Sequence, residues 1–373
     1  MNGKIGSLFL LSLASGLFRA GATGQPVECR VAETLPPAHS ATLDERFQAL
    51  FDMPGPGWTG GDSTYSVLLP DGRTAWLFSD TFLGVVDARG GRHRFSPLVN
   101  NTIVVQDGTS FTTLHGGDLT LPDSFFPAPA ENAWYWQYDG TVERTEEGEK
   151  LRIFLLHFRR AGDGVFGFQW VGTAIATLSL PELELEGIVP APSDGGVSWG
   201  AALLEEDEHL YIYGTEDLGD DKYMHLARAP RDGVLGAWEF WDGAAWTNDA
   251  GASARLLHGV ANEYSVTAHA GGYVLVTMDT STRFSPHLVV WTSCTPTGPW
   301  ENRTVVFDTP ETGGNDGNLI TYNAHAHPQF AEDGQWLISY NVNSLTFGDL
   351  FLDVNHYRPR FIRVRFGPEP AGE

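Results

Sequence analysis

A pair of short β-rich segments separated by a turn recurs five times along this chain, roughly every 60–75 residues. The first pair is Tyr65–Leu69 and Thr74–Ser79, joined by Pro70-Asp71-Gly72. A turn between two such segments is typical of a β-hairpin. The other pairs are Trp134–Val142 with Leu151–His157, Ser198–Leu204 with Leu210–Tyr213, Tyr264–His269 with Tyr273–Met278, and Ala326–Phe330 with Trp336–Tyr340.

One or two further β-rich segments follow each hairpin. We expect the third strands to be Asn101–Gln106, Gly172–Leu180, Tyr223–Ala229, His287–Cys294 and Phe361–Phe366. About four antiparallel strands in each of five units predict an all-β, five-bladed β-propeller. A β-sandwich is the main alternative, but it leaves the repeat unexplained.

The N-terminus predicts an export signal. A positive charge at Lys4 precedes the mostly apolar stretch Ile5–Phe18, and Ala20-Gly21-Ala22 is typical of a cleavage site. This stretch is too short to span a bilayer, and no later stretch approaches the ~20 apolar residues that a membrane helix needs. Asn-x-Thr sequons at Asn100 and Asn302 fit an exported chain. We therefore expect a secreted, extracellular monomer.

The sequence predicts a helix over Thr42–Asp52, because Thr42 and Glu45 form a capping box and Pro54 follows the helix. Almost every other segment reads as a strand or a turn. The expected organisation is a signal peptide at 1–22, an N-terminal segment with the short helix at 23–56, the propeller as catalytic domain at 57–367, and a tail at 368–373.

The two cysteines, Cys29 and Cys294, predict one disulfide in an oxidising compartment. Two buried free thiols are the alternative. No Cys-x-x-Cys or close Cys/His spacing accompanies them, so we predict no zinc site. We expect no cofactor and leave open a structural cation in the channel. The net charge of -24 argues against nucleic acid and anionic membranes as partners.

The hairpin topology collects polar and aromatic residues at one mouth of the central channel. The first and second strands run antiparallel, so the start of the first and the end of the second lie on the same face of the disk. Convergence of carboxylates, tryptophans, histidines and amides at this mouth indicates a binding site. The residues placed there are Trp58, Asp62, Asp80, Trp134, Trp136, His157, Trp199, Glu216, Asp217, Glu263, Asp279, Arg283, His325, His327, Asn341 and Asn343.

Two of these carboxylates are predicted to be neighbours. The turn Pro70-Asp71-Gly72 suits a type I turn followed by a left-handed glycine, which pairs Leu69 with Arg73 and, counting outward, Asp62 with Asp80. Directly opposite residues have Cβ atoms about 4.5–5.5 Å apart. Two carboxyl groups this close do not both ionise easily, which suits a general acid beside a nucleophile or base. The short separation favours a retaining over an inverting glycosidase.

Structural interpretations compete with these functional ones. Asp62 follows two glycines and could cap a turn. Glu216 and Asp217 could be solvated loop charges, and His325 and His327 could be a structural pair. The tryptophans could belong to the core, which is their commoner place.

A second catalytic motif is Gly196-Val197-Ser198-Trp199-Gly200, which matches the nucleophile elbow of serine hydrolases. That elbow requires a strand, a sharp turn and a helix. Here the serine leads into an apolar strand of a chain that is almost without helices. We therefore keep a serine esterase only as a minor alternative.

The segment Gly57–Phe82, with the sequence GWTGGDSTYSVLLPDGRTAWLFSDTF, resembles a family of secreted five-bladed propellers long labelled as of unknown function. Some members of that family are assigned to glycoside hydrolase family 183, which are endo-acting enzymes on D-arabinan. Further matching segments are Asn100-Asn101-Thr102, Tyr213-Gly214 and Glu263-Tyr264-Ser265-Val266. The resemblance covers nearly the whole mature chain, although only the first hairpin is highly specific.

The resemblance implies that Asp62 and Asp80 are the catalytic pair and that Glu263 lies in the pocket. Propellers of glycoside hydrolase family 43 instead take carboxylates from different blades, and on that plan Glu216 or Glu263 would be the acid. We expect hydrolysis of a polysaccharide, arabinan-type or otherwise furanosidic. The tryptophans would stack on sugar rings, while the histidines and asparagines would bind hydroxyls. A non-catalytic, lectin-like propeller is the alternative from another functional class.

Overall fold

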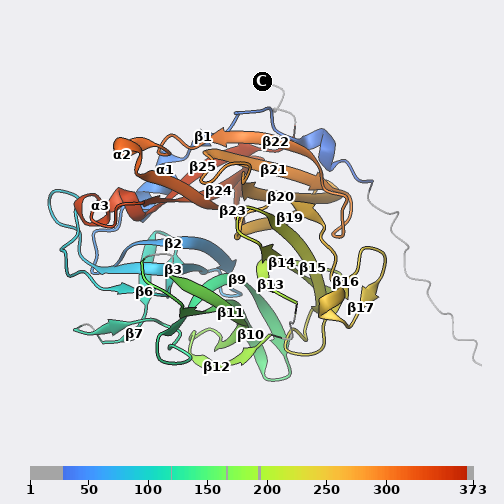
Figure 1. Ribbon diagram of the computed structural model, residues 1–373, viewed down its shortest axis with the longest axis horizontal. Helices are drawn as coiled ribbons and strands as arrows, with labels where there is room; N and C mark the ends of the chain where they lie inside the picture. The colour runs from blue at the N-terminus through green and yellow to red at the C-terminus, as the bar shows by residue number, and fades with distance from the viewer. Residues whose placement is uncertain (1–27, 119, 165–166, 192–194, 368–373) are drawn as a thin grey trace, which may run out of the picture.

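The computed structural model describes residues 28–118, 120–164, 167–191 and 195–367. Five antiparallel sheets are arranged around one axis as a five-bladed β-propeller, so the predicted fold class is confirmed (Figure 1). The predicted signal peptide and the C-terminal tail lie outside the described residues. No helix of the described chain has the length and apolar character needed to cross a membrane.

Each blade is one sheet whose first strand is innermost. Blade one contains β2 (Gly57–Leu68), β3 (Thr74–Gly84), β5 (Thr102–Asp107) and β6 (Ser110–Leu114), with β4 (Leu98–Val99) paired to β3. Blade two contains β9 (Ala133–Thr145), β10 (Gly148–Arg160), β11 (Phe168–Ser179) and β12 (Leu185–Pro190). Blade three contains β13 (Val197–Glu206), β14 (His209–Asp217), β15 (Lys222–Pro230), β16 (Glu239–Trp241), β17 (Trp246–Thr247) and β18 (Leu257–His258).

Blade four contains β19 (Tyr264–His269), β20 (Gly272–Met278), β21 (His287–Ser293) and β22 (Glu301–Asp308). Blade five contains β23 (Leu319–Glu332), β24 (Gln335–Ser344), β25 (Pro359–Arg365) and β1 (Thr42–Leu43). All five predicted hairpins are present. The remaining short elements are β7 (Gly116–Gly117), β8 (Pro122–Asp123), α1 (Glu45–Gln48), α2 (Gly314–Gly317), α3 (Asp349–Leu352), η1 (Val31–Thr34), η2 (Ala49–Phe51), η3 (Ala250–Ala252) and η4 (Val354–Tyr357).

The core lies between the blades, because each sheet packs against its two neighbours. Strand β20 has the sequence GYVLVTM, and all of its residues are buried. A strand buried on both faces reads as a continuous apolar run instead of an alternating one. This is why β20, the second strand of its hairpin, has an almost uninterrupted apolar sequence.

The start of the chain closes the ring, which corrects the helix expected over Thr42–Asp52. Thr42 and Leu43 instead form β1, which pairs with β25 through Thr42–Arg363 and Leu43–Ile362. The helical part is shorter, and its N-cap is Asp44, whose carboxylate accepts a bond from Phe47 N at 2.8 Å. The outer backbone edge of β25 is therefore paired by the N-terminal segment, and β1 is the fourth strand of the last blade.

A disulfide fixes the same segment to blade four. Cys29 and Cys294 are bonded, as predicted, and they are 265 residues apart in the sequence. Val31 follows the first cysteine and is buried among apolar residues of blades four and five. Two features therefore close the ring: the disulfide and the backbone hydrogen bonds between β1 and β25.

Removal of the disulfide in a Cys29→Ala/Cys294→Ala variant should lower stability by about 2–5 kcal/mol, because the bridge restricts a very long loop of the unfolded chain. Urea unfolding of both proteins at one pH measures this difference. The same midpoint in the variant and the native protein would show that β1 alone closes the ring.

Candidate active site

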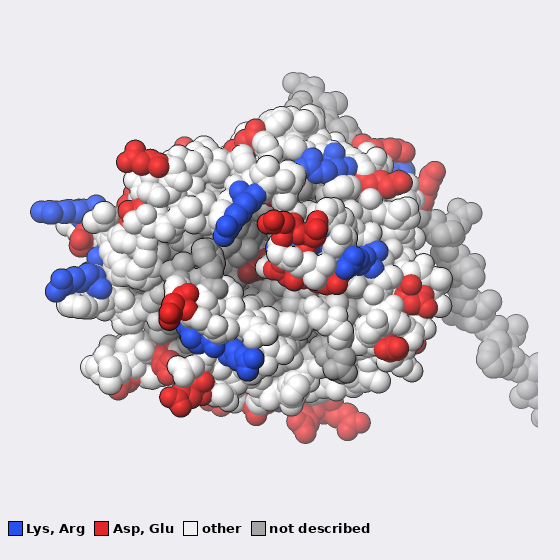
Figure 2. Space-filling view, in the orientation of Figure 1, with Lys and Arg blue, Asp and Glu red and all other residues white. Residues whose placement is uncertain are grey.

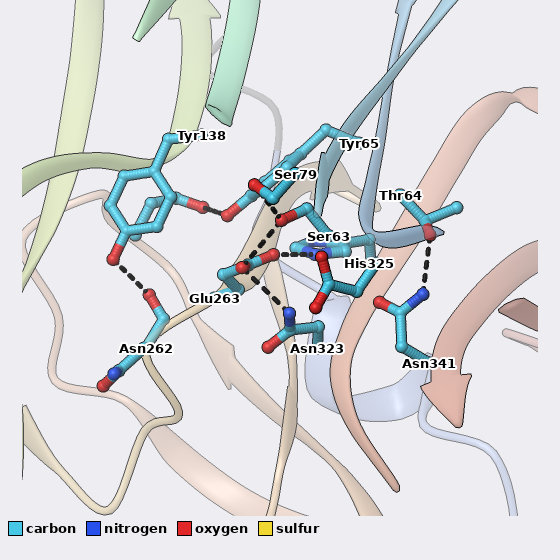
Figure 3. Close-up of polar contacts among 12 residues, drawn as sticks. Ser63, Thr64, Tyr65, Ser79, Tyr138, Asn262, Glu263, Asn323, His325 and Asn341 are labelled. Atoms are coloured by element: carbon cyan, nitrogen blue, oxygen red, sulfur yellow. Dashed lines mark hydrogen bonds and ion pairs between the residues drawn. The ribbon is translucent and has the colours of Figure 1, made fainter. Parts of the chain in front are cut away.

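Glu263 lies at the centre of a polar network contributed by several blades (Figure 3). Its Oε1 accepts bonds from Ser63 Oγ at 3.0 Å and from Asn323 Nδ2 at 2.9 Å. His325 Nε2 lies 3.1 Å from Oε2. The side chain is 13% exposed. Burial raises the pKa of Glu263 to about 8, although the bonds from Ser63 and Asn323 oppose the shift.

Two residues of β2 beside this network have left-handed backbones. Ser63 has φ 69° and Thr64 has φ 65°, which is a rare conformation for residues with a Cβ atom. Asn341 Nδ2 donates to Thr64 Oγ1 at 2.8 Å, and Ser63 Oγ lies 2.8 Å from Ser79 Oγ. Strained backbone that is held by its surroundings is typical of functional sites. The two strained residues directly follow Asp62, which is one of the predicted catalytic pair.

The left-handed residues alter the predicted pairing of Asp62 with Asp80. Leu69 pairs with Arg73 as expected, and the ladder holds as far as Tyr65 and Leu77. It is then interrupted by bulges and includes Gly61 opposite Thr81. Asp62 directly follows Gly61, and Asp80 directly precedes Thr81. The two aspartates are therefore close to this pair but do not form a ladder pair themselves. They still interact, because the charge of Asp80 contributes to the raised pKa of Asp62.

Asp62 lies in surroundings that favour its neutral form. Burial is the largest cause that raises its pKa well above the usual value, and the charges of Asp80 and Glu263 add to it. The Tyr322 hydroxyl donates to Oδ2 at 2.8 Å, but Oδ1 is buried and has no partner among the described residues. An ionised carboxylate with an unsatisfied buried oxygen is costly. The side chain is therefore suited to carry a proton.

Close packing behind Asp62 depends on a glycine. A Cβ atom on Gly60 would lie 2.0 Å from the carbonyl oxygen of Tyr357 and 2.1 Å from Nη2 of Arg92. The buried Arg92 donates to the carbonyl oxygen of Thr59 at 2.6 Å. This close approach holds Tyr357, which opposes the rise in the pKa of Asp62, against the inner strand of blade one.

The ionised form of Asp80 is stabilised by more neighbouring groups than that of Asp62. Burial raises its pKa, but Asn100 Nδ2 and Trp136 Nε1 donate to Oδ1 at 3.0 and 2.8 Å and oppose the shift. The positive charge of Arg160 acts in the same direction. Asp62 instead accepts its hydrogen bond from a tyrosine hydroxyl, that of Tyr322. When the pair holds one proton, we therefore assign the proton to Asp62.

Aromatic side chains of blade two surround Asp80. Trp134 and Trp136 are partly exposed, and their ring centroids lie 5.7 Å apart. Phe168 packs edge-on to both tryptophans. Arg160 lies over the Trp134 ring at 5.4 Å. These two tryptophans have the exposure that contact with a ligand needs.

Four other predicted contact residues are buried, and their predicted roles are wrong. Trp58 and Trp199 are 1% and 0% exposed and pack between blades, Trp58 against Phe78 and Trp199 against Phe240. His327 is fully buried and bonds Ser66 and Ser339. Asn341 is also fully buried and supports Thr64. Burial therefore leaves these side chains no surface for substrate.

His325 is 1% exposed as well, so it acts on the site only through its contact with Glu263. This residue therefore has no exposed surface for a sugar at the carboxylate pair. His157 is partly buried and its ring contacts Tyr135. The nearby Asn343 donates to the Tyr322 hydroxyl at 3.0 Å.

The carboxylates of blades three and four are held in ion pairs. Glu216 pairs with Arg255 and His225, and Arg255 is the main cause of its lowered pKa. Asp217 pairs with Lys222. Asp279 is buried, but bonds from Ser281, Ser285 and Arg303 outweigh burial and lower its pKa. A carboxylate fixed as an ion does not suit general acid catalysis, so Glu216 does not fit the role of acid.

Ser198 does not form a nucleophile elbow. It lies within β13, and its partners in the described chain are the Thr215 carbonyl oxygen at 3.0 Å and the Tyr138 hydroxyl at 3.3 Å. Neither partner is a general base. The Gly196–Gly200 motif therefore has no catalytic context.

The sequence analysis missed several residues that touch the carboxylates. Tyr322 was missed because the predicted first strand of blade five began at Ala326, whereas β23 begins at Leu319. Asn100 was noted as a glycosylation sequon, but its amide nitrogen bonds Asp80. Tyr357 lies in η4, and no local pattern signals its position.

Figure 2 shows a hollow near the middle of the face seen in Figure 1, with acidic side chains gathered beside it. Within the described residues, no group of three or more His, Cys, Asp or Glu side chains is arranged to hold a metal ion. The chemistry that this chain offers here is acid–base chemistry between carboxyl groups.

The raised pKa of Glu263 predicts a pH-dependent stability. Its folded-state value of about 8 exceeds the ordinary value of 4.5, so the stability it contributes is complete below about pH 4.5 and is lost as pH rises through 8. Thermal melting of the native protein should therefore fall more steeply between pH 5 and pH 8.5 than melting of a Glu263→Gln variant. Parallel curves for the two proteins would contradict the buried, protonated state.

Comparisons with known proteins agree with the observed fold. A family model described as "Domain of unknown function (DUF5005)" matches residues 44–366, and the chain therefore belongs to this family. No curated protein matches the chain. A crystal structure from Bacteroides ovatus, described as "a putative hydrolase", aligns with a TM-score of 0.74 at 22% identity over 87% of this chain and 90% of that one.

Other solved structures align less closely. An α-L-arabinofuranosidase from Podospora anserina, in complex with cellotriose, gives a TM-score of 0.47 at 10% identity over 89% of this chain and 96% of that one. An exo-β-1,3-galactanase from Phanerochaete chrysosporium gives 0.46 at 9% identity over 84% and 66%. At these values the matches carry no functional conclusion.

Proposed function

We propose that this member of the DUF5005 family is a glycoside hydrolase that cleaves a polysaccharide with Asp62 and Asp80. The observation that carries the proposal is a pair of interacting, partly exposed aspartates in different environments, since N–H donors and a cation oppose the rise in pKa at Asp80 but not at Asp62. Two carboxyl groups whose surroundings separate their protonation states are the requirement of glycoside hydrolysis.

The different surroundings of Asp62 and Asp80 suggest a different catalytic role for each. Asp62, whose surroundings favour the neutral form, donates its proton to the glycosidic oxygen as the bond to the anomeric carbon breaks. Asp80, supported by Asn100, Trp136 and Arg160, remains ionised. It attacks the anomeric carbon or removes a proton from the water that does so. Water supplies the hydroxyl group of the new reducing end, and Asp62 regains a proton.

Glu263 has a supporting role in this proposal. It accepts hydrogen bonds from Ser63 and Asn323 and lies 3.1 Å from His325 Nε2, and in its ionised form its charge contributes to the raised pKa of Asp62. It therefore holds the left-handed segment of β2 and influences Asp62 without needing to contact the sugar.

The proposed sugar platform is the exposed surface of Trp134 and Trp136. Flat apolar ring faces stack on the C–H faces of sugars. Trp136 also bonds Asp80, so a sugar that lies on it is next to the reacting carboxylate. The resemblance of residues 57–82 to family 183 propellers makes D-arabinan the first polysaccharide to test.

Asp80→Asn should abolish hydrolysis of D-arabinan or another cleaved glycan, with a loss of at least ~1000-fold in kcat/KM, because no carboxylate is left to attack or to activate water. Asp62→Asn should lose activity on the polysaccharide but retain much more on an aryl glycoside whose leaving group needs no proton. Product analysis on a glycan panel measures both effects. Asp217→Asn is the matched control, since it changes an acid that pairs with Lys222.

Glycan binding by the native protein without hydrolysis on the whole panel would contradict the enzyme and support a lectin-like propeller. Equal losses for Asp62→Asn on polysaccharide and aryl glycoside would contradict the assignment of Asp62 as the acid.

Trp136→Phe removes one of the N–H donors to Asp80 and keeps an aromatic face. The pKa of Asp80 should rise, so the acidic limb of the kcat/KM profile should move to higher pH. Trp134→Phe is the control, because Trp134 Nε1 has no partner in the described chain. An acidic limb that stays in place in Trp136→Phe would show that Asp80 does not set it.

A further inference from the structure

A cavity of about 240 Å³ lies on the propeller axis on the opposite side from the carboxylate pair. All five innermost strands line it, with residues closer to the hairpin turns than those of the candidate active site. Leu68, which is 53% exposed, and the exposed Pro328 are part of its wall, so the cavity reaches the surface.

The wall of the cavity is polar and carries no lysine or arginine side chain. Its hydroxyl, amide and carboxylate groups come from different blades, among them Ser66, Asp139, Glu205, Ser265, Thr267 and Gln329. Because these side chains belong to separate strands, their convergence is a property of the assembled ring.

Hydrogen-bond acceptors predominate on this wall. Asp139 accepts backbone N–H bonds from Gly140 at 2.8 Å and from Leu203 at 2.9 Å. Burial, with a contribution from the charge of Glu205, raises the pKa of Asp139 to about 7. His325 also lines the cavity, and its Nδ1 has no partner among the described residues. Glu205 is paired with Arg231, which is not part of the wall, so Asp139 and His325 are the groups that favour a ligand able to supply hydrogen-bond donors.

We propose that this cavity is a second binding site, for a small neutral polyol of the size of a monosaccharide. Each hydroxyl group of such a ligand both donates and accepts, which matches a wall of carboxylates and hydroxyls. A metal ion is a poorer match, because no group of three suitable ligands is present in the described chain. Binding at this site does not depend on the proposed function.

The two ends of the channel share one side chain. His325 lines the cavity and lies 3.1 Å from Glu263 in the candidate active site. Tyr65 also lines the cavity, and its ring centroid is 3.9 Å from that of His325. A bound polyol would therefore contact the residues that support the catalytic network from behind.

Calorimetric titration with D-arabinose, D-xylose and D-galactose tests this site in the full-length protein. We expect at least one of these sugars to bind with a millimolar Kd. Thr267→Phe, which fills the cavity, should weaken that binding at least tenfold, whereas Thr267→Ser, which keeps the hydroxyl group and leaves the cavity open, should change it by less than about threefold. Gln329→Leu is a second variant that removes a polar wall group, and a thermal melt checks that each variant is folded.

The Trp136→Ala variant distinguishes sugar binding in the cavity from sugar binding at the candidate active site, because only the active site contains Trp136. Sugar binding that survives Trp136→Ala but not Thr267→Phe supports the cavity site. No binding of any of the three sugars overturns it, and so does binding that Trp136→Ala removes and the cavity variants leave unchanged. Binding of CaCl2 without sugar binding would also overturn it. Hydrolysis measurements are not needed for any of these outcomes.

Discussion

The innermost strand of every blade presents one backbone edge to the channel, and this edge has no strand partner. Buried N–H and C=O groups must nevertheless be hydrogen-bonded. Side chains of the preceding blade meet this requirement: Gln137 N donates to Ser79 Oγ, Leu203 N to Asp139 Oδ2 and Ala326 N to Ser265 Oγ, at 2.8–2.9 Å. The polar side chains along the axis are therefore required by the fold before they serve any ligand.

At the mouth of the channel, carboxyl groups likewise depend on hydrogen bonds from side chains of other blades. Asp62, Asp80 and Glu263 lie in partly buried positions where charge is costly, and each has a raised pKa. Their partners come from blades one, two and five, so the differences between them depend on the closed ring. The left-handed Ser63 and Thr64 are held by the same bonds. Closure by β1 and the disulfide offsets the cost of this arrangement.

The repeat made the fold predictable, and strand topology made the neighbourhood of the site predictable. Asp62 and Asp80 could be brought together by counting from one turn, although two left-handed residues interrupt the ladder between them. Which of the side chains at the strand ends are exposed could not be predicted from the turns and the repeat. Trp58 and Trp134 occupy similar places at strand starts, yet the first packs on Phe51 and Phe78 and the second is partly exposed. The difference depends on which elements cover each strand end.

By itself, the sequence determined the blades, the disulfide partners and the hairpin that carries both aspartates, because these follow from local turns, period and cysteine count. Only the tertiary structure decided which aspartate favours its proton. That difference depends on Tyr322 from blade five and on Asn100 and Trp136 from blades one and two, which approach the pair only after the ring has closed. Side-chain environments of this kind are set by packing between distant segments, and no local pattern encodes them.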